Sequence, residues 1–443
     1  MTKARRTGLL LMLLGAGLFV LTGEAFQRST PLGLMDFKVL YHGARCFIHS
    51  CDPYNVGELQ RFYKADGGEQ PSDPPIIRYV VTEYVYLPTT FLFTGPFATL
   101  PWGLAHVLWT ILTVACFITA AFLIWNLCAD YAPVLAGALI GFWLASSVVI
   151  FAGGNAVGLV ISLCVIAVRS LIRERFAWGG VLCLSISLLI KPHDAGLVWL
   201  FFLLAGGTYR KRALQTLAVT AALGLVAFLW ASNVSPHWWQ EQHANLAAIS
   251  TQGGMNDPAP GSTVDRTPGL VIDLQSIVSI FRNSPRTYNA VSYGICGSLI
   301  LLWAVHTLRS QRSLRNTWLA LAAIAPLTML VTYHKPYDAK LLLLTIPAGI
   351  LLWIEGGRLG RVAVLVNTVA IVFTSDIPLG ILVFLTRNFH SDTGTLHGMI
   401  LTVVLTRPAT LILLGMAVFY LWVYTRHANP DTKVSPRAPD SSQ

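Results

Sequence analysis

Three short stretches of this sequence bring together the ionisable side chains that proton and phosphate chemistry requires. The first surrounds Asp36 in "LMDFKVLYHGARCFIHSCDPYN" (34–55), the second is "LLIKPHDAG" (188–196), and the third is "LVTYHKPYDAKLL" (330–342). A carboxylate can take the proton of a hydroxyl nucleophile, and Lys and His side chains can stabilise negative charge on a phosphate. These stretches are therefore the candidates for a reaction site.

Each stretch also has a purely structural explanation. Asp36 begins a helical pattern, where a carboxylate contributes about 0.3–1 kcal/mol, and spacing alone favours that role. Lys191 could extend its ammonium group to the membrane surface, and Asp194 could be the N-cap of the next helix. Tyr333 and Tyr337 fit an interfacial aromatic belt. The third stretch also holds four ionisable groups within seven residues, more than anchoring needs: His334, Lys335, Asp338 and Lys340.

Two smaller features accompany these stretches. "FAGGNAVG" (151–158) is a Gly-rich break between apolar runs, which could bring backbone close to a ligand or be a plain membrane turn. "CFIHSC" offers Cys46, His49 and Cys51, but three ligands on a short helix are weak grounds for a zinc site. A Cys46–Cys51 disulfide outside the membrane is the favoured interpretation.

The composition places these residues in a membrane protein. The chain is 54% hydrophobic and 12% charged, with a mean hydropathy of +0.60, whereas soluble domains carry about 25% charged residues. Runs such as 103–128, 213–232 and 399–425 approach or exceed the roughly 20 apolar residues that one helical span needs. We therefore expect an all-α integral membrane protein.

The net charge of +10 indicates topology rather than nucleic-acid binding. Basic residues gather in short segments between apolar runs, which marks those segments as cytoplasmic. These basic residues are Lys3, Arg5, Arg6, Arg169, Arg173, Arg175, Arg210, Lys211, Arg212, Arg309, Arg312, Arg315, Arg358, Arg361 and Arg426. With these residues inside, all three chemical stretches fall on the outer face. The sequence predicts about 12 spans, with a short amphipathic helix after Asp36.

We expect one transmembrane domain over residues 1–425. Its outer loops are predicted at 23–80 and 233–287, and a disordered cytoplasmic tail at 426–443. The run at 84–100 is the one expected not to cross, because Pro88, Gly95 and Pro96 interrupt it. Residues 8–22 could form a cleaved signal peptide, but the following "TGEAF" is a poor cleavage site and favours a retained span.

Several segments resemble glycosyltransferase family 87. They are "MDFKVLYHGARCFIHSCDPYN", "YVYLPTTFLFTGPFATLP", "GGNAVGLVISLCVIAVRSLIRERFAWGGVLCLSISLLIKPHDAGLV" and "YHKPYDAKLLLLTIPA". Their order and spacing carry the resemblance, which extends over most of residues 30–355. The resemblance implies the polytopic GT-C fold of membrane glycosyltransferases. These enzymes move a sugar from a polyprenyl-phosphate carrier to an acceptor on the outer side of the membrane.

The resemblance also assigns roles to residues. Asp36 would be the general base, Lys191 the lysine of the family's Lys-Pro motif, and His334 a histidine near the donor phosphate. It implies an inverting hexosyl transfer, with mannose favoured, in the cell inner membrane with the site facing the periplasm. The acceptor would be a glycolipid or glycan, and no metal or cofactor is expected. The remaining residues expected to bind donor phosphate or substrate are His193, Lys335, Asn155 and Tyr41.

A lipid-linked oligosaccharide transporter or polymerase is the alternative function. It would also gather charges near one face of the membrane. A transporter should carry ionisable groups at mid-bilayer and a path to both faces. The apolar runs here are almost free of such groups, which favours the enzyme.

Overall fold

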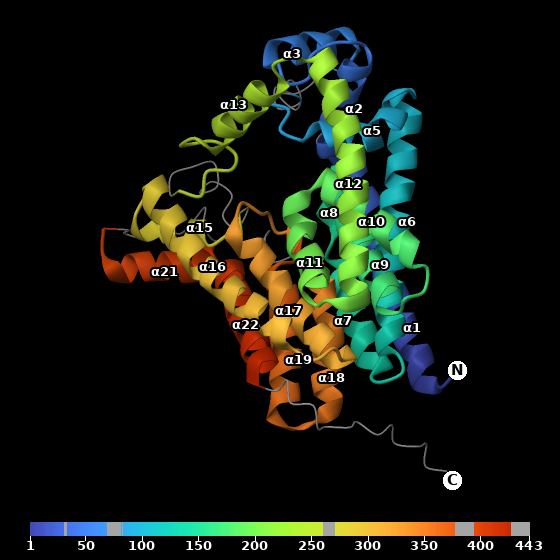
Figure 1. The fold of residues 1–443 in the computed structure, drawn as a ribbon, viewed down its shortest axis with the longest axis vertical. Coiled ribbons are helices and arrows are strands. Elements are labelled where there is room, and N and C mark those ends of the chain that lie inside the picture. Colours follow the sequence, from blue (N-terminus) through green and yellow to red (C-terminus); the bar gives the residue numbers. More distant parts are fainter. Residues whose placement is uncertain (31–32, 69–80, 82, 260–270, 377–393, 427–443) are drawn as a thin grey trace.

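The structure is a computed structural model that describes residues 1–30, 33–68, 81, 83–259, 271–376 and 394–426. All regular structure in these residues is helical, as expected (Figure 1). The first half comprises α1 (Lys3–Ser29), α2 (Met35–Ile48), α3 (Val56–Ala65), η1 (Pro88–Thr90), α5 (Phe91–Ala98), α6 (Trp102–Cys128), α7 (Pro133–Ala145), α8 (Val148–Gly153), α9 (Ala156–Ile172), α10 (Ala177–Ile190) and α11 (Pro192–Leu204). The second half comprises α12 (Gly207–Val234), α13 (Trp238–Ser250), α15 (Gln275–Phe281), α16 (Pro285–Arg309), α17 (Leu314–Val331), η2 (Asp338–Thr345), α18 (Ile346–Glu355), α19 (Gly357–Phe373), α21 (Leu396–Thr406) and α22 (Pro408–Arg426).

Six of the described helices are long and apolar enough to cross a membrane: α1, α6, α12, α16, α17 and α22. Shorter apolar helices, including α7, α9, α10 and α11, pack among them. Prolines at the first helical position begin several of these helices, because that position needs no N–H partner. The fold is therefore an all-α membrane bundle, and the expected total of about 12 spans stays a prediction. The expected tail, 426–443, lies outside the described residues apart from Arg426.

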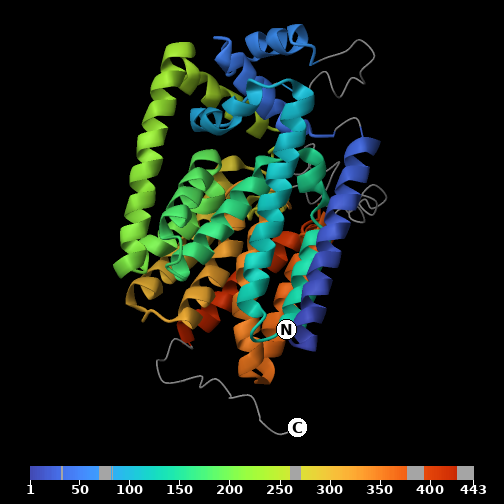
Figure 2. The same cartoon turned by 90° about the vertical axis from the view of Figure 1, so that its right-hand side faces the viewer.

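The first helix is packed into the bundle through glycines. A Cβ atom on Gly8 would lie 2.1 Å from the Pro133 carbonyl oxygen, and one on Gly15 would lie 2.1 Å from the Gly141 carbonyl oxygen. Glycines allow two membrane helices to approach until their backbones touch. Helix α1 extends to Ser29, well past residue 22, and lies along α7 over much of its length (Figure 2). That this span is retained stays a prediction.

The basic turns lie at one end of the bundle. Arg5 in α1 bonds Asp130 after α6 at 3.0 Å, and Arg315 in α17 bonds Glu355 at the end of α18 at 2.6 Å. The N-terminus lies at that end, whereas α2, α3 and α5 form a layer at the other end (Figures 1 and 2). The charge pattern thus separates the two ends of the molecule as the sequence predicts.

The interrupted run at 84–100 does not cross the bundle. It forms η1 and the short helix α5, which packs on α2 in the outer layer. The rings of Phe47 in α2 and Phe91 in α5 stack with centroids 4.2 Å apart. Cys46, in the last turn of α2, and Cys51, just after the helix, form the expected disulfide. The bond joins the end of the helix to the turn that follows. Asp36 lies in the first turn of α2, which belongs to this layer.

Candidate active site

Asp36 is positioned by the junction between α8 and the beginning of α2. Leu34 adopts a left-handed conformation with φ of 57°, and its N–H donates to the carbonyl of Ala152 at 2.7 Å. A left-handed non-glycine residue costs free energy and persists where its surroundings enforce it. The bond to Ala152 ties the entry of α2 to the end of α8, so Asp36 in the first turn faces the α8–α9 break.

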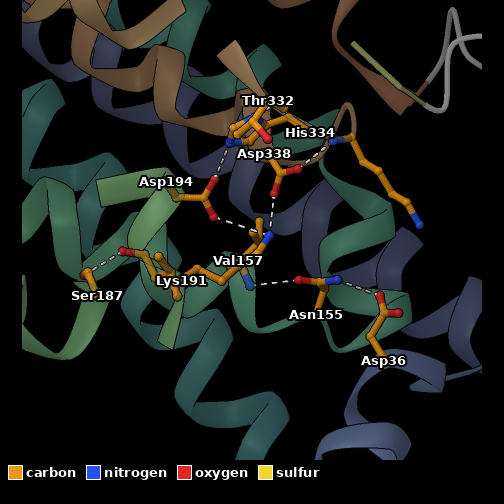
Figure 3. Close-up of polar contacts among 11 residues, drawn as sticks. Asp36, Asn155, Val157, Ser187, Lys191, Asp194, Thr332, His334 and Asp338 are labelled. Carbon is orange, nitrogen blue, oxygen red and sulfur yellow. Dashed lines mark hydrogen bonds and ion pairs between the residues drawn. The ribbon is translucent and has the colours of Figure 1, made fainter. Parts of the chain in front are cut away.

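The α8–α9 break holds the Asp36 carboxylate directly. Asn155 caps α9 by accepting from the N–H of Val157 at 2.9 Å, and its amide Nδ2 donates to Asp36 Oδ2 at 2.8 Å (Figure 3). The preceding Gly154 has φ of +63°, a conformation that glycine adopts without strain. Asp36 therefore does more than interact with its own helix dipole, because a second helix fixes one of its oxygens.

Gly153 leaves the space that this carboxylate occupies. A Cβ atom at Gly153 would lie 3.2 Å from Asp36 Oδ2, tighter than an ordinary van der Waals contact. We expect Gly153→Ala to shift the carboxylate and to lower the rate of a reaction in which Asp36 takes part roughly 10- to 100-fold, because small displacements of a reacting group are costly. The rate is measured with the folded variant in detergent. Gly103→Ala, where nothing lies within 4 Å, is the matched control and should retain the wild-type rate.

Lys191 lies between two buried aspartates. Its Nζ is 2.8 Å from Asp338 Oδ1 and 3.3 Å from Asp194 Oδ2, and both carboxylate side chains are 1% exposed. Buried charges persist when they are paired in this way. Lys191 points inward rather than to the membrane surface. Asp194 lies in the first turn of α11, whose N-cap makes no side-chain bond, so its carboxylate serves the ion pairs.

The surroundings of His334 favour the charged form of its ring. Its Nδ1 donates to the Thr332 carbonyl at 2.7 Å, and its Nε2 lies 3.2 Å from Asp194 Oδ1. The carbonyl of Thr332 requires a proton on Nδ1, and the nearby Asp194 carboxylate favours a second proton on Nε2. Burial lowers the pKa of His334, but Asp194 and Asp338 outweigh burial and raise that pKa above its ordinary value of 6.5. Lys191 and His334 together balance the two aspartates.

Lys335 is the lysine whose charge interacts with that of Asp36. Its backbone N–H donates to Asp338 Oδ2 at 2.6 Å, while its ammonium group lies 5.9 Å from the ring centres of Tyr333 and Tyr337. Burial lowers the pKa of Lys335, and the charges of Asp36 and Asp338 oppose that effect. Its side chain is partly exposed, so its charge can reach a ligand.

Most of the residues singled out in the sequence gather in this region (Figure 3). Asp36, Asn155, Lys191 and His334 lie in one view, with Lys335 joined to them through Asp338. His193 is exposed, and its ring centre is 5.1 Å from that of His334. Tyr41 lies apart: its hydroxyl donates to the Leu100 carbonyl at 2.7 Å, on another face of α2.

The sequence interpretation did not include Asp194 and Asp338 among the site residues. A signal for them exists, because "KPHD" (191–194) and "KPYD" (335–338) repeat the pattern Lys-Pro-x-Asp. The structure pairs the two copies: Lys191 of the first bonds Asp338 of the second. Each proline sets the turn that brings its lysine and aspartate together. The repeat is the structural link between the second and third stretches.

Three potential metal ligands also lie here. Donor atoms of His193, Asp194 and His334 are within 4.8 Å of one another. A cation bound to them would meet the Lys191 ammonium group, which is 3.3 Å from Asp194, and would have to replace the proton that joins His334 to Asp194. The charges present therefore suit the ion-paired form of the cluster better than a metal-bound form.

The comparison with known families decides the class of this protein. The sequence model of glycosyltransferase family 87 matches residues 84–333. The chain belongs to glycosyltransferase family 87. No curated protein and no solved structure matches it. The matched range includes Asn155 and Lys191 but neither Asp36 nor His334, so the family assignment and the charged cluster are separate observations. The protein is a multi-pass membrane glycosyltransferase.

Proposed function

We propose that this family 87 glycosyltransferase moves a sugar from a polyprenyl-phosphate carrier to a glycolipid or glycan acceptor, with inversion at the anomeric carbon. The observation that supports the proposal is that Asp36 and His334 lie in one region of the membrane bundle (Figure 3), with Lys335 bound there through Asp338. A base and a phosphate-binding pair are the two parts that this reaction needs.

The reaction follows from these side chains. Asp36 accepts the proton of an acceptor hydroxyl while that oxygen forms a bond to the anomeric carbon. The bond between that carbon and the phosphate oxygen breaks, and the electron pair leaves with polyprenyl phosphate. Lys335 pairs with the departing anion, and His334, whose ring nitrogens face Thr332 and Asp194, contributes through its charge. Attack occurs opposite the leaving phosphate, which inverts the anomeric centre.

The same proposal sets the orientation in the membrane. Because basic turns mark the cytoplasmic side, the end that holds Asp36 faces outward, to the periplasm in an inner membrane. The polyprenyl chain stays in lipid and presents its sugar at that surface, which makes the transfer effectively intramolecular. Mannose is the sugar that the family resemblance favours.

The other residues position this machinery. We propose that Lys191 acts on the donor by fixing Asp194 and Asp338, which in turn hold His334 and the backbone of Lys335. Asn155 orients the Asp36 carboxylate, and His193 extends the cluster toward the surface. No metal or cofactor takes part in this scheme.

A donor comparison tests the function. Purified protein in lipid nanodiscs is given radiolabelled polyprenyl-phosphate mannose or the matching nucleotide mannose, together with membrane glycolipids as acceptors. Transfer is expected from the polyprenyl donor alone, and a chelator should leave the rate unchanged. Transfer from the nucleotide sugar alone, or a rate abolished by the chelator and restored by a divalent metal, would contradict the corresponding part of the proposal.

Activity should fall as the pH rises through the elevated pKa of His334. Asp194 holds the imidazolium in the folded protein, so the stabilisation from this pair is complete below the unfolded value of 6.5. The stabilisation from the pair disappears as the pH rises through the pKa of His334 in the folded protein. Phosphate binding is expected to weaken over the same pH range. Transfer rates from mildly acidic to alkaline pH provide the measurement. The His334→Gln variant should lack this alkaline limb; an identical profile in both proteins would remove His334 from the mechanism.

A further inference from the structure

A polar cavity lies on a different face of α2 from Asp36. Its volume is about 200 Å³, and the residues that shape it include Tyr41, His42, Arg45, Asp66, Gly67 and Trp102. They come from α2, from the segment after α3, and from the turn before α6. The candidate active site uses none of their contacts.

Helix periodicity separates the two sites. Lys38, Tyr41, His42 and Arg45 recur at the spacing of one helix face, and that face meets Asp66 and the α5–α6 turn. Asp36 instead points to Asn155 at the α8–α9 break. Six residues separate Asp36 from His42, which is roughly 9 Å along the helix axis. One rigid helix therefore carries both sites.

A carboxylate is held rigidly in the cavity wall. Arg45 Nε contacts both oxygens of Asp66, at 2.9 and 2.8 Å, and its Nη1 donates to the Ala98 carbonyl at 3.1 Å. The side chains of Arg45 and Asp66 remain 26% and 18% exposed. Each Asp66 oxygen keeps further acceptor capacity, so a ligand hydroxyl can donate to it while the guanidinium offers donors beside it.

Aromatic rings line the same cavity. The His42 ring lies nearly parallel to Trp102, with centres 6.1 Å apart, and Tyr41 meets Trp102 edge-on at 5.2 Å. Burial lowers the pKa of His42 to about 4, although Asp66 opposes that shift, so the imidazole is neutral near pH 7. Trp102 is the first residue of the long apolar helix α6, the level at which membrane proteins place interfacial tryptophans.

We propose that this cavity binds a sugar residue of the glycan acceptor, beyond the residue that reacts at Asp36. A sugar ring combines C–H faces that pack on aromatic rings with hydroxyls that pair with carboxylate and guanidinium groups. Lys38 and Arg45 also line the cavity, but Arg45 is already paired with Asp66, and the Asp66 carboxylate disfavours a phosphate ligand. The charged lining disfavours an acyl chain. The inference rests on the proposed function. If the cavity binds a second sugar residue, acceptors longer than one sugar bind more tightly than a single sugar.

The test measures binding without any donor. Full-length protein in detergent micelles is titrated with methyl mannoside and with a linear mannotetraose by calorimetry. The wild-type protein should prefer the tetrasaccharide, and Asp66→Asn should reduce tetrasaccharide affinity about tenfold, the loss of one hydrogen bond to a charged group. Arg61→Gln, on the exposed side of α3, is the control and should bind like the wild type.

A second variant keeps the test independent of the Arg45–Asp66 pair. Gly67 has φ of +75°, and among the described residues nothing lies within 4 Å of a Cβ atom there. Asparagine is one of the few other residues that adopt this conformation, so Gly67→Asn adds a side chain to the cavity wall at a limited cost in backbone strain. Reduced tetrasaccharide affinity in either folded variant supports the proposal. Wild-type affinity in both, or displacement of the sugar by inorganic phosphate, overturns it. Because no donor is present, these results do not depend on whether Asp36 catalyses transfer.

Discussion

Asp36→Asn is expected to lower the transfer rate about 10²- to 10⁴-fold, the range that a general base contributes. The substitution keeps the size of the side chain but removes the ability to take a proton. Asn155 contacts only Oδ2 of Asp36, and among the described residues Oδ1 makes no hydrogen bond, so the second oxygen is the one that meets the acceptor. Single-turnover transfer of radiolabelled sugar, at saturating acceptor, measures the step directly.

The control for this variant is a carboxylate in the same outer layer. Glu58→Gln changes an acid in the first turn of α3, which has no contact with the Asp36 site, and should transfer sugar at the wild-type rate. If Asp36→Asn also transfers at that rate, the base is another residue. A variant that fails to bind donor, rather than failing to react, would instead make Asp36 a binding residue.

Lys191→Met should destabilise the folded protein by about 3–5 kcal/mol, because it leaves buried carboxylates without their cation. Asp194 and Asp338 are both 1% exposed and both depend on Lys191. Thermal unfolding of the detergent-solubilised protein, followed by intrinsic fluorescence, measures the loss. Adding Asp338→Asn to Lys191→Met should recover part of it, since one unpaired charge is removed.

Lys335→Met is the matched comparison for Lys191. Its ammonium group is partly exposed and faces tyrosine rings, so its removal should change the unfolding temperature little. Its effect should appear in donor binding, with Lys335→Arg retaining more activity than Lys335→Met. Equal destabilisation by Lys191→Met and Lys335→Met would contradict the division between a structural lysine and a phosphate-binding lysine.

The sequence by itself determined the membrane class, the separation of the basic and chemical ends, and the run at 84–100 that does not cross. These follow from composition and local pattern, because lipid requires long apolar helices and charge bias orients them. Cys46 and Cys51, five positions apart, also form the disulfide that their spacing allows. The family resemblance then directed attention to Asp36, whose spacing alone favoured a helix-start role.

Only the tertiary structure decided which charged residue does what. Lys191 and Lys335 stand in the same Lys-Pro-x-Asp pattern, yet the fold pairs the ammonium group of Lys191 with two buried aspartates and places that of Lys335 near two tyrosine rings. Asp36 and Tyr41 lie five positions apart on one helix, yet Asp36 meets the α8–α9 break and Tyr41 meets the α5–α6 turn. The physical reason is that ion pairing joins residues more than a hundred positions apart, as in Lys191 and Asp338, so the repeated pattern points to both lysines but cannot show which of them is held between the aspartates.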